Sequence, residues 1–111
     1  MPQLSFHGVR FEDVQAISSA LVATLADAMD TTEDNFILEV NPSVQVQAGE
    51  LVTPYPFVEV RWFARGQAIQ DASAQVITHA LQQQGYAEVE VFFLPLSEAA
   101  YYYQGKHFAN T

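Results

Sequence analysis

Few side chains in this sequence could bind or transform a substrate. The cations number four, so an anionic substrate would have to bind at Arg10, Arg61, Arg65 or Lys106. Arg65 stands beside Gly66 in a predicted loop, where binding residues concentrate, and is a candidate substrate-binding residue, with a solvated surface charge as the alternative. Arg61 has a simpler role, because it shares a predicted sheet face with three glutamates whose charge it would balance.

The sequence contains no pattern typical of a metal site or of an activated nucleophile. Cysteine is absent, which excludes thiol catalysis, cysteine metal sites and disulfides. His7, His79 and His107 lack metal-ligand spacing, and there is no glycine-rich phosphate loop or serine elbow. We therefore expect no metal and no cofactor. His107 lies in the C-terminal segment and is a candidate for lining a site between subunits.

The charge balance narrows the range of partners. The 111 residues carry 13 acidic and 4 basic side chains, a net charge of −9. Nucleic acids and anionic membranes both require a basic surface, which four cations cannot provide. No segment approaches the ~20 apolar residues of a membrane span, and the first residues lack the pattern of a secretory signal. We expect a cytoplasmic protein that binds neither nucleic acid nor membranes.

The elements that must position these residues form a duplicated βαβ pattern. Apolar residues at i+3/i+4 spacing predict helices over residues 12–29 and 67–84. Alternating or continuous apolar runs predict strands over residues 3–7, 36–40, 57–63 and 89–94. The matching halves cover about 2–41 and 56–95, so we expect one domain over residues 1–111. Right-handed crossovers would place both helices on one face of a single mixed sheet, an α+β fold.

The two connecting segments carry weaker signals. The connector 41–55 is long, and its alternating apolar residues predict a short strand and a turn. From Ser97 onward we expect a helical turn capped by Ser97, followed by an extended end.

The sheet face turned away from the helices mixes aromatic and charged side chains. It should present Phe57, Phe63, Phe92 and Leu94 together with Arg61 and the glutamates Glu39, Glu59 and Glu90. Burial against copies of the same chain would cover this apolar area, whereas an open sheet with scattered exposed aromatics is the alternative. We expect Arg61 to be substantially buried and paired with at least one of the three glutamates, because a lone buried guanidinium is costly.

Several motifs resemble the tautomerase superfamily, the group of macrophage migration inhibitory factor and oxalocrotonate tautomerase. They are the Met1-Pro2 start that opens a strand, the βαβ duplication, the chain length and the tail Gly105-Lys106-His107-Phe108. The segment 56–63, Pro-Phe-Val-Glu-Val-Arg-Trp-Phe, and the following Arg65-Gly66-Gln67 resemble an uncharacterised bacterial family within that superfamily.

The resemblance implies a homotrimer with the sheets facing inward and the helices outside. It also implies catalysis by an N-terminal proline, here Pro2 after removal of Met1. Arg10, just before the first helix, is similar in position to an arginine that binds a substrate carboxylate in oxalocrotonate tautomerase. Arg61 and Arg65 have no equally firm counterpart, and no Lys or Arg lies between residues 11 and 60.

Pro2 carries the most specific hypothesis. A free N-terminal proline is a secondary amine, and an apolar site near cations would lower its pKa so that it could move a proton between carbon and oxygen of a small 2-oxo acid. With Met1 attached, the nitrogen is an amide and cannot act as a base; a proline that merely begins an edge strand is the structural alternative.

Three functions therefore stay open. The first is a keto–enol tautomerase or isomerase acting on a small carboxylate. The second is a non-catalytic oligomeric protein with the same fold. The third is a ferredoxin-like ligand-sensing module, against which the long connector 41–55 argues.

Overall fold

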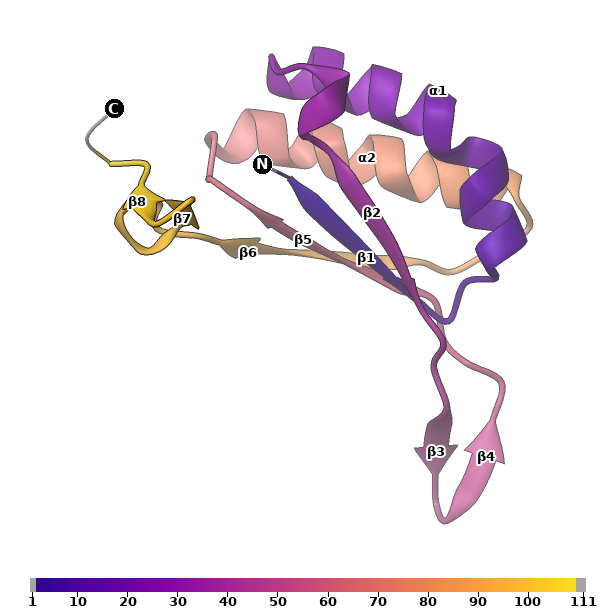
Figure 1. The fold of residues 1–111 in the computed structure, drawn as a ribbon. Coiled ribbons are helices and arrows are strands. Elements are labelled where there is room, and N and C mark those ends of the chain that lie inside the picture. Colours follow the sequence, from indigo (N-terminus) through magenta and orange to yellow (C-terminus); the bar gives the residue numbers. More distant parts are fainter. Residues whose placement is uncertain (1, 110–111) are drawn as a thin grey trace.

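The computed structural model describes residues 2–109 and contains the expected pair of βαβ units (Figure 1). The first unit consists of β1 (Gln3–His7), α1 (Phe11–Met29) and β2 (Ile37–Asn41); the second of β5 (Phe57–Trp62), α2 (Gln67–Gln83) and β6 (Glu90–Pro95). The strands lie in the order β2-β1-β5-β6, with β1 parallel to β2, β5 parallel to β6, and β1 antiparallel to β5. Each helix thus joins two adjacent strands, whereas a split βαβ unit, as in a ferredoxin-like module, has another strand between them.

Both helices cover one face of the sheet, as predicted (Figure 1). The predicted stripe of α1 is buried at Val14, Ile17, Leu21, Leu25 and Met29. On α2, Ile77 and Leu81 are buried with Ser73, whose hydroxyl donates a hydrogen bond of 2.8 Å to the carbonyl of Ile69. This bond satisfies the one polar side chain in the stripe. Ala72, expected on the same face, is exposed.

The core lies between the helices and the sheet. Leu4 pairs with Val60 and Phe6 with Val58 across β1 and β5, and all four side chains are fully buried. Trp62 extends the same row and packs against Phe93 with ring centroids 4.8 Å apart. The strand predicted from residue 36 begins one residue later, because Phe36 follows a 3-10 helix, η1 (Glu33–Asn35), that the pattern did not predict.

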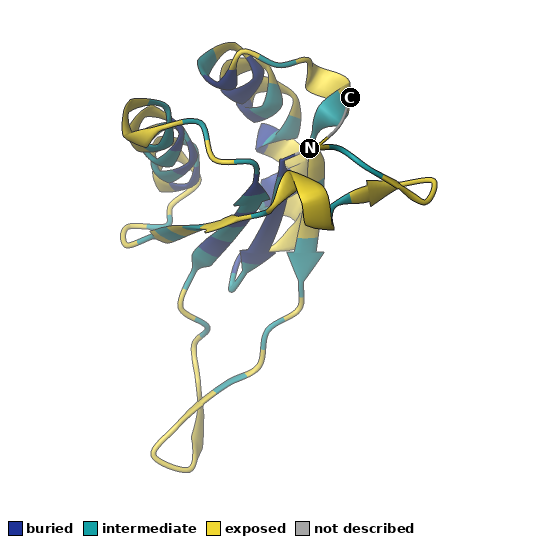
Figure 2. Ribbon diagram, turned by 90° about the vertical axis from the view of Figure 1, so that its left-hand side faces the viewer, coloured by how far each residue is buried: buried dark blue, intermediate teal, exposed yellow. Residues whose placement is uncertain are grey.

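The connector forms a hairpin in place of the single short strand that was predicted. β3 (Gln45–Gln47) and β4 (Glu50–Val52) pair antiparallel. The hairpin projects from the body of the molecule on the side away from the helices (Figure 1) and is largely exposed (Figure 2).

The C-terminal segment packs on the end of β5. A 3-10 helix, η2 (Glu98–Ala100), precedes two short strands, β7 (Tyr102–Tyr103) and β8 (Lys106–His107). Ser97 occupies the N-cap position, but its side chain makes no capping hydrogen bond, so the predicted cap is wrong in that respect. Phe63 lies against Tyr101 and Phe108, with centroids 5.2 and 5.8 Å apart, which leaves it half-buried within the chain.

No helix among residues 2–109 has the length and apolar character needed to cross a membrane. The cytoplasmic location remains a prediction.

Candidate functional site

Pro2 is fully buried at the start of β1. Its carbonyl accepts a hydrogen bond of 3.1 Å from the backbone N–H of Ile37. β1 lies between β2 and β5, so it is an inner strand of the sheet. The alternative in which a proline begins an edge strand is therefore wrong. This position buries the Pro2 ring away from solvent.

Arg65 lies at the same end of the sheet as Pro2. Because β1 and β5 run antiparallel and Gln3 pairs with Arg61, the chain leaves β5 beside the N-terminus of β1. The Nη1 atom of Arg65 donates a hydrogen bond of 3.1 Å to the carbonyl of Met29, the last residue of α1. Arg65 is therefore half-buried and bound to a helix end, not a free surface charge.

Two buried donors near this end have no acceptor among the described residues. They are Nε of Arg65 and Nε1 of Trp62. Buried donors are almost always satisfied in folded proteins, so such groups call for an explanation. An acceptor outside this chain, such as a ligand oxygen, would satisfy them.

Arg10 lies at the opposite end of β1. The strand alone spans roughly 16 Å at about 3.3 Å per residue, so Arg10 and Pro2 cannot meet within one chain. The Arg10 side chain is 73% exposed and its Nε lies 3.4 Å from Oδ2 of Asp13. The prediction that Arg10 approaches Pro2 therefore fails inside a single copy.

Tyr86 fixes the backbone next to Arg10. Its hydroxyl accepts a hydrogen bond of 2.9 Å from the Arg10 N–H and donates one of 2.5 Å to Oδ2 of Asp13. Desolvation, followed by the hydrogen bond to Asp13, raises the pKa of Tyr86. The Tyr86 hydroxyl is therefore protonated at neutral pH. Its two hydrogen bonds connect the segment before β6 to the start of α1.

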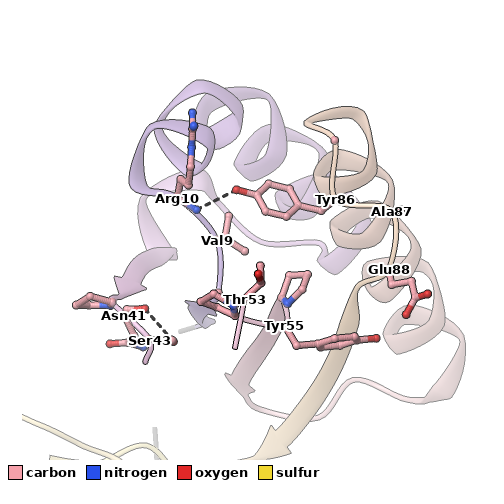
Figure 3. Close-up of a pocket in the computed structure, with 14 residues that line it drawn as sticks. Val9, Arg10, Asn41, Ser43, Thr53, Tyr55, Tyr86, Ala87 and Glu88 are labelled. Atoms are coloured by element: carbon pink, nitrogen blue, oxygen red, sulfur yellow. Dashed lines mark hydrogen bonds between the residues drawn. The ribbon is translucent and has the colours of Figure 1, made fainter. Parts of the chain in front are cut away.

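A cavity of about 720 Å³ opens beside Tyr86, between the end of β1, the base of the hairpin and the segment before β6 (Figure 3). Asn41, Ser43, Thr53 and Tyr55 contribute its polar groups. The Arg10 side chain points away from Thr53 and Tyr55 (Figure 3). Sequence reasoning missed this cavity, because four separate stretches of the chain form it and none carries a motif.

The charges around this cavity do not favour an anion. Glu88 lies in its lining. Partial desolvation, with the charges of Glu90 and Glu88, raises the pKa of Tyr55. Among the described residues that line the cavity, Arg10 is the one cation, and its guanidinium points away from Thr53 and Tyr55 (Figure 3).

The open face of the sheet holds a connected polar row. Arg61 Nη2 lies 2.8 Å from Oε2 of Glu59, and its Nη1 donates a hydrogen bond of 3.1 Å to Oγ of Ser5. His7 Nε2 lies 3.1 Å from the other carboxylate oxygen of Glu59, and the His7 ring stacks on Phe57 at 4.4 Å. The expected pairing of Arg61 is confirmed, although its side chain is only partly buried, at 38% exposure.

His107 lies in β8, beyond the same sheet end as Pro2 and Arg65. β6 leads into the tail next to the end of β5, since the N–H of Leu96 donates a hydrogen bond of 2.7 Å to the Trp62 carbonyl. Nδ1 of His107 accepts a hydrogen bond of 3.2 Å from the N–H of Ala109. His107 also borders a second cavity, of about 320 Å³, formed by the tail alone. Among residues 2–109, no three His, Asp or Glu side chains are grouped as a metal site.

This arrangement, with two βαβ units and both helices on one face of a mixed sheet, is that of the tautomerase and macrophage migration inhibitory factor fold. Pt0534, in a structure described as inactivated by 2-oxo-3-pentynoate, superposes with a TM-score of 0.76 at 16% identity, covering 97% of this chain and 94% of that one. A macrophage migration inhibitory factor-like protein from Entamoeba histolytica gives 0.71 at 14% identity, covering 96% of each. At such identities the likeness shows the fold alone.

The family is shown by a closer match. The model of the family described as "Domain of unknown function (DUF1904)" matches residues 1–107, and the chain belongs to that family. A DUF1904 domain from Sebaldella termitidis ATCC 33386 superposes with a TM-score of 0.91 at 28% identity, covering 97% of this chain and all of that one. Comparison with curated proteins gives no match. Both the tautomerase fold and membership of an uncharacterised family were predicted from the sequence.

Proposed function

We propose that this protein is a keto–enol tautomerase or isomerase of a small 2-oxo acid, with Pro2 as the general base after removal of Met1. The observation that carries this role is the burial of Pro2 at the start of an inner strand. A secondary amine freed there would sit in apolar surroundings, which disfavour its charged form and lower its pKa towards neutrality. It would then take a proton from the carbon next to the carbonyl and return one to the enolate at the other atom.

Arg65 is the cation that we assign to this site. It lies at the Pro2 end of the sheet, and its buried Nε has no acceptor among the described residues. A carboxylate or an enolate oxygen of the substrate would supply that acceptor. His107, in the tail beyond the same sheet end, is the next candidate.

Arg10 takes part only if a second copy brings it to Pro2. Because it lies at the far end of β1, an assembly that sets the Arg10 end of one copy against the Pro2 end of another is required. We propose a homotrimer with the open sheet faces inward, as the superfamily resemblance implies. The exposed Ile37, Phe92 and Leu94 on that face support this arrangement.

A non-catalytic oligomer with the same fold is the second candidate. The cavity linings favour it, since a substrate must reach the base, and neither of the two cavities described above is lined by Pro2. In this reading Pro2 only fills the end of the core.

The decisive experiment uses untagged protein whose N-terminus is defined by intact mass. Protein without Met1 should ketonise the enol of phenylpyruvate, and Pro2→Ala should reduce that rate by about 10²–10⁴-fold. A chain that keeps one glycine before Pro2 is the matched control, because it retains the ring and blocks the amine. Retention of Met1 in untagged protein would exclude catalysis by Pro2.

A second readout does not depend on the choice of substrate. 2-Oxo-3-pentynoate, which inactivates Pt0534, should add its mass to the processed chain at Pro2 and leave the glycine-extended control unmodified. Processed protein that is neither modified nor active would favour the non-catalytic oligomer.

A further inference from the structure

The hairpin between β2 and β5 forms a projecting arm, defined here as residues 43–53 (Figure 1). Its base is held by a double hydrogen bond: Gln45 Nε2 donates to the Tyr55 carbonyl at 3.1 Å, and the Tyr55 N–H donates to Gln45 Oε1 at 2.7 Å. At its tip, Ala48 and Gly49 have φ angles of 52° and 79°, as a tight turn requires. The arm is therefore an ordered hairpin with a defined orientation relative to the sheet.

One face of the arm is apolar. Val46 and Leu51 are direct cross-strand partners, so their side chains lie on the same face, and alternation places Val44 there too. These three side chains are between 63% and 78% exposed. The opposite face carries Gln47 paired with Glu50 and Gln45 paired with Val52, which is 38% exposed.

An arm of this kind gains little stability alone. An isolated two-stranded hairpin is marginal in water, and grouped exposed apolar side chains mark an interaction surface. The described elements of its own chain give the arm no cover, because it extends away from the sheet and both helices (Figure 1).

The distribution of charge favours a second copy of the chain as the partner that covers the apolar face of the arm. The chain has a net charge of −9, yet the segment between Glu39 and Glu59 contains one charged residue, Glu50. The arm can therefore approach another copy with little like-charge repulsion. The same chain also exposes a second apolar surface on the open sheet face, formed by Phe92 and Leu94 of β6, which are 42% and 41% exposed.

We infer that the apolar face of the arm packs against the open sheet face of a second copy, around Phe92 and Leu94. The two surfaces differ, so the contact is heterologous: each copy gives its arm to one neighbour and its sheet face to the other, and the contacts close into a ring. A stable interface buries roughly 800 Å² per partner, and the ring buries both surfaces of every copy. This packing rests on the proposed self-association and is independent of catalysis by Pro2.

Because the sequence contains no cysteine, each introduced cysteine is the one thiol in its chain and cross-links form at a known position. Chains carrying Leu51→Cys are mixed with chains carrying Phe92→Cys and treated with a bis-maleimide on a short flexible spacer. The expected product is a cross-link between positions 51 and 92, identified by mass spectrometry of the joined peptides. Gln47→Cys replaces Leu51→Cys in the matched control, which presents a thiol on the opposite arm face and should give several-fold less product.

Association is measured in parallel by analytical ultracentrifugation. Leu51→Asp should weaken it by at least about tenfold, as the loss of one buried leucine implies, while Gln47→Asp should change it less than about twofold. Circular dichroism checks that each variant is folded. Because the arm lies outside the core, its substitutions should leave the fold intact.

The outcomes separate this packing from the function proposed above. Cross-links that join position 51 to position 51 would mean that arms pair with arms and would overturn it. If the wild type is oligomeric but the variants at Leu51 and Gln47 cross-link and associate equally, this packing is also overturned. The proposed trimer would not be affected by that result. A monomeric wild-type protein would overturn both the packing and the trimer, without bearing on the modification of Pro2.

Discussion

At the scale of single residues, Arg65 shows how one side chain can serve both the fold and a candidate site. α1 has no basic residue in its last turn, where its carbonyl groups carry partial negative charge. The guanidinium of Arg65 supplies that charge from outside the helix by donating to Met29. The same contact holds it at the Pro2 end of the sheet.

Arg65→Met should therefore lower the free energy of unfolding by about 1–2 kcal/mol, through loss of the hydrogen bond and of the favourable charge at the helix end. Arg10→Met is the matched control and should cost less than about 0.5 kcal/mol, since an exposed ion pair contributes little. Urea denaturation of the two variants compares them. Equal losses would show that Arg65 does not stabilise α1.

Gly8 is a second residue on which the backbone depends. Its φ angle is +70°, and an added Cβ would lie 2.5 Å from the backbone oxygen of Tyr55. Gly8→Ala should therefore destabilise the protein by about 3 kcal/mol or more, because strain and a backbone clash add. Gly49→Ala, at φ +79° with nothing within 4 Å, should cost only the strain of roughly 1–2 kcal/mol. Thermal or urea unfolding measures the difference, and similar losses in both variants would contradict the clash.

At the scale of elements, periodicity predicted the two helices and four main strands because each buries one face against the others. The pattern could not show that Phe63 is covered by Tyr101 and Phe108, since that contact depends on how the tail folds back. Nor could it show that Arg65 lies at the Pro2 end of the sheet, which follows from the antiparallel register of β1 and β5. Long-range positions of this kind follow from the register of the strands, not from local spacing.

Tyr86 is the side chain that ties the two βαβ units together at the cavity. Tyr86→Phe should reduce stability at neutral pH by about 1–2 kcal/mol, because the Arg10 N–H and Asp13 each lose a partner. Chemical denaturation of the variant beside the wild type gives this value.

The pH dependence of Tyr86 has a defined sign. Since its pKa is raised in the folded state above the ordinary value of 10.0, its contribution is complete below pH 10 and is lost as pH rises through the folded pKa. Wild-type stability should thus fall more steeply above pH 10 than that of Tyr86→Phe. Tyr55, whose pKa is also raised, is present in both proteins, so its contribution to the pH dependence of stability cancels in the comparison. Parallel alkaline unfolding curves would rule out this role of Tyr86.

At the scale of the whole molecule, charge and apolar surface act in opposite directions. Each copy carries a net charge of −9, so copies repel one another, while the open sheet face and the arm expose side chains that favour association. On the open face, Arg61 offsets part of the charge by pairing with Glu59. The balance between charge repulsion and apolar attraction depends on the salt concentration. At 0.1 M, salt screens the repulsion beyond about 10 Å and leaves the apolar contacts essentially unchanged.

Self-association should therefore strengthen as sodium chloride rises from about 10 to 150 mM, where the screening length falls from roughly 30 to 8 Å. Ion pairs across the interface would respond in the opposite direction, since salt weakens attraction between opposite charges. Sedimentation velocity at fixed protein concentration and several salt concentrations distinguishes the two. Dissociation on adding salt would mean that interfacial ion pairs, with Arg61 the first candidate, hold the copies together, and that apolar packing of the arm and sheet face does not dominate.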